Sequence, residues 1–86
     1  MANGMSESSF AILQAELMAA RTKFPGNRHL LAALTEELGE LARALLQRQG
    51  TKRVRAEAVQ VACVAMRIFE EGDKIFEDVT DEEAKA

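Results

Sequence analysis

The chain has 86 residues, a formal net charge of −3 from 11 basic and 14 acidic side chains, and no Trp or Tyr. A domain of this size buries only about 60% of the surface that its unfolded chain exposes, so we expect one domain with a thin core that self-association would extend. The acidic balance argues against nucleic-acid binding, and no apolar stretch approaches the roughly 20 residues of a membrane span. With a single cysteine and no secretory signal, the sequence predicts a soluble protein of the reducing cytoplasm.

Apolar residues recur at helical spacing between three breakers, and this pattern predicts three main helices. The breakers are the Pro25-Gly26 pair, Gly50 and Gly72. The helices are expected over about residues 6–23, from after Asn27 to about 49, and over about 52–71, with Asn27 as the N-cap of the second. Because only two or three residues join the second helix to the third, the third returns antiparallel to it.

The first helix and the C-terminal segment complete the predicted bundle. Phe10, Leu13, Leu17 and Phe24 fall on one arc of the first helix and are expected to face the core. In the segment 73–86, the apolar side chains of Ile75, Phe76 and Val79 would cover the open end of the bundle. We expect fraying over residues 80–86 and at the first few residues. The predicted fold is thus an all-α antiparallel helical bundle, a single domain over residues 1–86, completed by oligomerisation.

Two glutamates interrupt the apolar face of the second helix. Glu37 falls beside Leu30 and Leu41 on the apolar arc, and Glu40 follows three residues later, which puts the two Cβ atoms about 5 to 6 Å apart. Glutamates at this spacing also line solvated helix faces. For this pair alone, a shared ligand and an ordinary surface are equally good interpretations, and for Glu36 a solvated position is favoured.

The third helix carries a stronger anomaly. Glu57 projects among Val61, Val64 and Ile68, inside the face that should be buried, and Gln60 sits at its edge. Because a buried carboxylate is costly without positive charge, carboxylates that converge between antiparallel helices call for a cation. Carboxylate oxygens without a nearby His or Cys pair suit Mg²⁺ or Mn²⁺, and Mg²⁺ often takes substrate phosphates as further ligands. The pattern therefore predicts a Mg²⁺ site and indicates a nucleotide as ligand.

The same residues resemble the motifs of the MazG-like, all-α nucleoside triphosphate pyrophosphohydrolase family. Glu36-Glu37-Leu38-Gly39-Glu40 matches the family pattern E-E-x-x-E, and Glu57-Ala58-Val59-Gln60 follows the pattern E-x-x-D on the next helix. The resemblance covers about residues 29–73. It departs at Gln60, where the family has Asp, so a neutral amide oxygen stands in place of a carboxylate.

The resemblance implies a function and a site. It makes Glu37, Glu40 and Glu57 metal ligands, Gln60 a weaker fourth ligand, and Glu36 a water-orienting base or a support for a ligand. The implied reaction is Mg²⁺-dependent hydrolysis of a nucleoside triphosphate to the monophosphate and pyrophosphate, of the house-cleaning type. It also implies homodimers or homotetramers with active sites near helices of more than one subunit.

Four further residues are candidates for binding the substrate. Lys52 and Arg53 open the third helix, and Arg67 is the basic residue in the middle of its apolar run, so each is a candidate for holding phosphates. His29, at the start of the second helix, is a candidate for stacking on a base. A solvated helix edge, an ion pair or a capping position explains these residues about as well.

Two alternatives to the enzyme stay open. The first is a non-catalytic relative that binds a nucleotide or metal without turnover, because Gln60 replaces an anionic ligand. The second is a structural helical oligomer in which Glu37, Glu40 and Glu57 pair with arginines. Cys63 lies among small apolar residues with no base placed to activate it, so it is expected to pack in the core.

Overall fold

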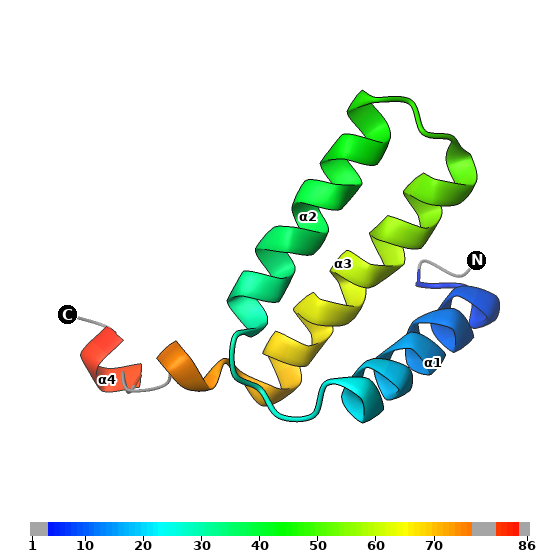
Figure 1. Cartoon of the computed structure of the whole chain (residues 1–86). Coiled ribbons are helices and arrows are strands. Elements are labelled where there is room, and N and C mark those ends of the chain that lie inside the picture. The colour runs from blue at the N-terminus through cyan, green and yellow to red at the C-terminus, as the bar shows by residue number, and fades with distance from the viewer. Residues whose placement is uncertain (1–3, 77–80, 85–86) are drawn as a thin grey trace.

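The computed structural model describes residues 4–76 and 81–84, and every regular element in this part of the chain is helical. The elements are α1 (Glu7–Lys23), α2 (Leu30–Leu46), α3 (Thr51–Glu71), the 3₁₀ turn η1 (Lys74–Phe76) and the single turn α4 (Asp81–Ala84). Figure 1 shows α2 and α3 side by side and antiparallel. The predicted all-α bundle is confirmed. No described helix is long and apolar enough to cross a bilayer. Ile75 and Phe76 stay 39% and 61% exposed and do not close the end of the bundle as expected, and residues 81–84, inside the segment expected to fray, form the turn α4. Val79 and residues 1–3, 80, 85 and 86 lie outside the described residues.

α1 begins where predicted but buries less than predicted. Ser6 is its N-cap, because the Ser6 hydroxyl accepts a hydrogen bond from the Ser9 amide at 3.1 Å. Leu17 is buried, whereas Phe10 and Phe24 are 58% and 63% exposed. Placing these two phenylalanines in the core was wrong. In the described part of the chain α1 packs on α3 and not on α2, and a helix with one neighbour buries only a narrow stripe.

α2 starts at Leu30, later than predicted, because Asn27 is not its N-cap. The side-chain amide of Asn27 instead donates to the backbone carbonyl of Glu71 at 2.6 Å. The backbone carbonyl of Asn27 accepts from the backbone amide of Lys74. The residue at the helix entry, His29, is left-handed with φ 66°. The first turn is capped across the fold, since the Asp73 carboxylate accepts from the amide of Leu31 at 2.7 Å.

α2 also ends earlier than predicted, at Leu46 instead of about residue 49. Arg48 adopts the left-handed conformation with φ 51°, and the amides of Arg48 and Gln49 bond back to the carbonyls of Leu45 and Ala44. This pair of bonds is a Schellman motif, in which a left-handed residue satisfies the last carbonyls. Gly50, with φ 103°, therefore serves the entry into α3 and not the end of α2.

The core lies along α3, which contacts both other long helices. Its apolar buried residues are few: Leu17, Leu30, Ala44 and Cys63. Polar contacts add to the packing of α1, since Arg21 binds Glu70 at 2.6 Å and Glu71 at 2.7 Å. Because α1 does not pack on α2, a space stays open between these two helices, with α3 as its floor. The candidate site lies beside this space.

Candidate metal centre

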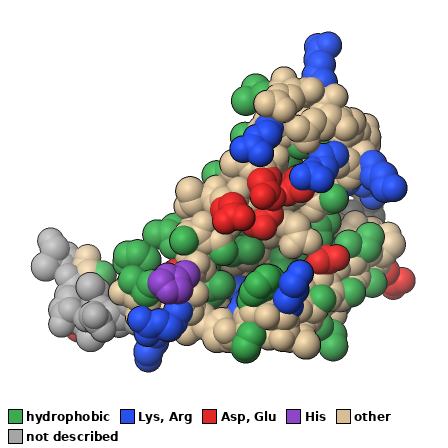
Figure 2. Space-filling view, viewed as in Figure 1, with side chains coloured by type: hydrophobic (Ala, Val, Ile, Leu, Met, Phe, Trp, Pro, Cys, Tyr) green, Lys and Arg blue, Asp and Glu red, His purple; other side chains and the backbone are tan. Residues whose placement is uncertain are grey.

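Three predicted ligands meet between α2 and α3. Glu37 and Glu40, one turn apart on α2, face Glu57 of the antiparallel α3, and one carboxylate oxygen from each lies within 4.8 Å of the other two. Glu37 and Glu40 are partly exposed, and Glu57 is buried. In Figure 2 acidic side chains gather on the visible face where α2 and α3 run side by side. The positions of these glutamates on the apolar faces of their helices predicted that they meet, and the antiparallel packing of α2 on α3 brings them together.

Glu57 is the least satisfied member of the triad. The residue is only 7% exposed, and its Oε1 binds Nε of Arg53 at 3.1 Å. Its Oε2 is buried without any hydrogen-bond partner in the described structure. A buried carboxylate oxygen without a donor is costly, and it fits a site that an additional positive group would complete. The donor set is all carboxylate oxygen, the set preferred by Mg²⁺ and Mn²⁺.

The electrostatics of the triad agree with its geometry. Burial raises the pKa of Glu37, and repulsion from Glu40, Glu57 and Glu36 raises it further. Burial also raises the pKa of Glu57, as does the neighbouring Glu40 carboxyl, whereas Arg53 acts in the opposite direction. Both shifts mean that the folded chain resists accumulating negative charge here. A divalent cation would relieve this repulsion.

The fourth predicted ligand, Gln60, has a partner from another helix. Its side-chain amide donates a hydrogen bond to Oε2 of Glu16, on α1, at 2.8 Å. Glu16 is a site residue that the sequence interpretation missed. No motif includes Glu16. Its proximity to Gln60 depends on how α1 packs against α3, and the apolar periodicity of a single helix cannot predict that packing.

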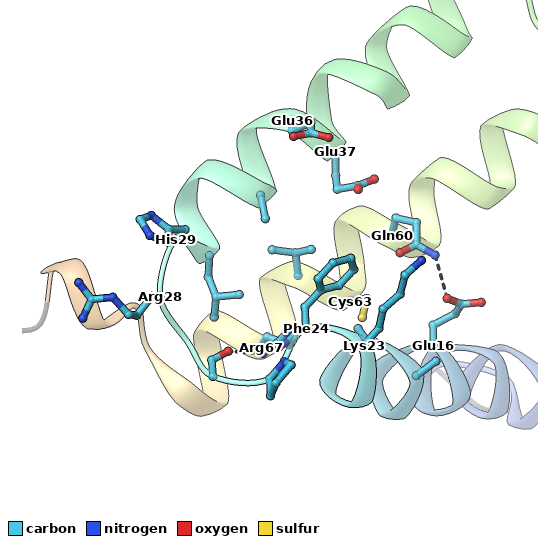
Figure 3. A pocket seen from close by; sticks show the side chains of 17 residues that line it. Glu16, Lys23, Phe24, Arg28, His29, Glu36, Glu37, Gln60, Cys63 and Arg67 are labelled. Atoms are coloured by element: carbon cyan, nitrogen blue, oxygen red, sulfur yellow. Dashed lines mark hydrogen bonds between the residues drawn. The ribbon is translucent and has the colours of Figure 1, made fainter.

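A cavity of about 770 Å³ opens between α1, α2 and α3 and adjoins the triad. Glu37 lines this cavity (Figure 3). Other predicted site residues that line it are Glu36, Gln60, His29 and Arg67. Two basic residues that the sequence interpretation did not select, Lys23 and Arg28, line it as well. Lys52 and Arg53 are not among its lining residues; they are exposed at the start of α3, with Arg53 directed to Glu57.

Arg67 has a well-defined set of partners. It is only 4% exposed, and its guanidinium donates to the carboxylate of Glu71 and to the carbonyl of Gly26. The bond to Gly26 ties α3 to the loop between α1 and α2, which forms one wall of the cavity, while the bond to Glu71 stays within α3. The predicted pairing of Arg67 with a glutamate is therefore found, with a partner outside the triad.

Comparisons with known proteins add no further identification: no protein-family model matches the chain, and neither curated proteins nor solved structures give a significant match.

Proposed function

We propose that this chain is a Mg²⁺-dependent nucleoside triphosphate pyrophosphohydrolase of the MazG-like type. The reaction would be addition of water across the anhydride between the α- and β-phosphates, which releases a nucleoside monophosphate and pyrophosphate. Glu37, Glu40 and Glu57 would hold Mg²⁺ or Mn²⁺, and Glu36 at the cavity wall would orient the attacking water. The unpartnered Oε2 of Glu57, buried where three carboxylates converge, is the observation that carries this proposal.

The bound cation would neutralise phosphate charge and lower the pKa of water, which is the chemistry that phosphate hydrolysis requires. The chain itself would supply binding and position. The cavity of about 770 Å³ falls within the roughly 300 to 1,000 Å³ of typical small-molecule sites. Lys23 and Arg28 line its wall together with His29, so cationic and aromatic side chains are available for phosphates and a base.

The proposal includes self-association. Large apolar side chains stay exposed on the three helices, and Leu46 and Phe69 are each 83% exposed. Because a three-helix unit of this size cannot bury every apolar face, a homodimer or homotetramer would cover them. In such an assembly a second subunit would lie near the triad, which is on the same pair of helices.

A second candidate is the structural helical oligomer, and one observation favours it. Arg53 lies 3.1 Å from Glu57 and already supplies positive charge at the triad. If arginines from the same or a neighbouring subunit satisfy the remaining carboxylates, no cation is needed. This alternative predicts that Mg²⁺ leaves the stability of the protein unchanged.

The test is pyrophosphate release from a panel of ribo- and deoxynucleoside triphosphates, with Mg²⁺ and with EDTA. Four proteins are compared: wild type, Glu57→Gln, Gln60→Asp, and Glu7→Gln as a control on exposed surface of α1. The proposal expects Mg²⁺-dependent release by wild type and by the control, and loss in Glu57→Gln. Release only in Gln60→Asp would identify a non-catalytic relative, and no release in any protein would contradict the proposal.

A further inference from the structure

The contact between Glu16 and Gln60 fixes which end of the Gln60 amide faces the cavity. An ionised carboxylate has only acceptor oxygens, whereas a glutamine side chain ends in one donor group and one acceptor oxygen. Gln60 therefore meets Glu16 through its NH₂ group, as observed at 2.8 Å. The opposite end of the planar amide, its carbonyl oxygen, must then point away from Glu16.

Glu16 and Gln60 line the same cavity, and the oxygen lies on the side of the amide opposite Glu16. Gln60 and Glu37 both line the cavity, from α3 and α2 respectively, and Glu16 contributes from α1. Figure 3 shows the Gln60 oxygen turned away from Glu16 and toward the interior of the cavity. A freely rotating amide would present NH₂ and oxygen about equally, and an NH₂ group repels a cation.

We propose that Glu16 is a positioning residue, which holds the Gln60 amide so that its carbonyl oxygen serves as a neutral ligand for the cation of the proposed reaction. This inference rests on the proposed function. It explains how a glutamine works in the fourth position: a carboxylate needs no orientation because both of its ends are acceptors, but an amide does. The negative partner needed to orient it comes from α1.

The first experiment compares wild type with Glu16→Gln and Glu16→Met by titration with Mn²⁺, followed through the electron paramagnetic resonance signal of the free ion. Both variants lose the acceptor-only partner: Gln at position 16 can meet Gln60 with either end of its amide, and Met offers no hydrogen bond. Outer partners that orient a ligand are worth about 10- to 100-fold in metal affinity. We expect both variants to bind Mn²⁺ about tenfold more weakly than wild type.

The same comparison in a Gln60→Met background shows whether Glu16 acts through Gln60. Most of the loss caused by changing Glu16 should then disappear, because no amide is left to orient, and the remainder reports the lost charge alone. Wild-type affinity in both Glu16 variants when Gln60 is present would overturn the inference, and so would an equally large loss with Met at position 60. In both cases the proposed metal site would stand.

A metal-free measurement separates this inference from the proposed function. In ¹⁵N spectra, the Gln60 side-chain amide is identified by its absence in Gln60→Met. One of its protons should be shifted downfield and slow to exchange, unlike those of exposed Gln14, and Glu16→Met should abolish this difference. If wild type binds no Mn²⁺, the proposed function fails while the spectrum still reports the orientation. A Gln60 amide like that of Gln14 would overturn the inference whatever the metal result.

Discussion

Replacing Glu57 by Gln should stabilise the metal-free protein. One carboxylate oxygen from each of Glu37, Glu40 and Glu57 lies within 4.8 Å of the other two. Two unit charges at that separation repel by about 3.5 kcal/mol at an effective dielectric constant of about 20, and by about 1 kcal/mol in bulk water. The amide removes this repulsion and adds a donor beside the remaining carboxylates. It also weakens the ion pair with Arg53, whose side chain is 57% exposed, and pairs with a solvated partner are worth about 1 kcal/mol or less.

We therefore expect Glu57→Gln to raise the free energy of unfolding in EDTA by about 1 to 2 kcal/mol, which for a chain of this size is about 4 to 16 °C in Tm. Adding Mg²⁺ should instead stabilise wild type more than Glu57→Gln. A cation present at 100 times its Kd adds about 2.7 kcal/mol to the stability of the protein that binds it. Wild type should gain this increment, and Glu57→Gln should lose most of it.

Urea unfolding at fixed protein concentration, with EDTA and with Mg²⁺, measures both effects, and Glu7→Gln serves as the control. The reasoning is refuted if Glu57→Gln is less stable than wild type in EDTA. That result would mean that the pairing with Arg53 outweighs the repulsion among the glutamates. The structural oligomer, in which the carboxylates are already satisfied, would then be the better interpretation of the triad.

Three further predictions concern pH, the glycines and the cysteine. Because the folded-state pKa values of Glu37 and Glu57 are raised, the folded chain binds more protons than the unfolded one above the ordinary carboxyl pKa of 4.5. Metal-free stability should therefore rise as pH falls from neutral toward that value, and urea unfolding across pH checks it. Gly39→Ala should stabilise the protein by about 0.5 to 1 kcal/mol, because Gly39 lies in an exposed turn of α2 with space for a methyl group. Gly50→Ala should destabilise the protein, because φ 103° is strained for any residue with a side chain. Thermal unfolding of each variant measures both effects. Buried Cys63 should react with a thiol reagent only as fast as the chain opens.

The sequence was sufficient to predict features that depend on one helix at a time. The angular position of Glu57 among apolar residues predicted its burial, because that angle does not depend on where the helix ends. The pairing of α2 with α3 followed from the short connection between them. These two facts together brought Glu57 next to Glu37 and Glu40, so the triad could be predicted without any knowledge of α1.

Features that depend on contacts between distant segments could not be predicted. Asn27 has the right chemistry for an N-cap, yet its amide binds the carbonyl of Glu71, 44 residues away. One local feature was also missed: Arg48 ends α2 in a conformation that sequence preference assigns to glycine, so Gly50 was the stronger signal. The contact between Glu16 and Gln60 likewise depends on how α1 packs against α3. The apolar arc of α1 did not predict this packing, because it placed Phe10 and Phe24 in the core and both are exposed.

The cap of α2 provides a direct test of this distinction between local and distant contacts. Asp73 accepts from the amide of Leu31 at 2.7 Å and from that of Ile75 at 3.0 Å, and these bonds lower the pKa of its carboxyl. Asp73→Ala should cost about 0.5 to 2 kcal/mol, the usual range for losing a cap, and Asp73→Asn should cost less, since Asn caps nearly as well. Hydrogen exchange of the Leu31 amide reports the bond itself. It should accelerate in Asp73→Ala and stay slow in Asn27→Ala. If Asn27→Ala exposes the Leu31 amide as much as Asp73→Ala does, the bond from Asn27 to Glu71 supports the entry of α2 as much as Asp73 does, and the carboxylate cap is not its specific support.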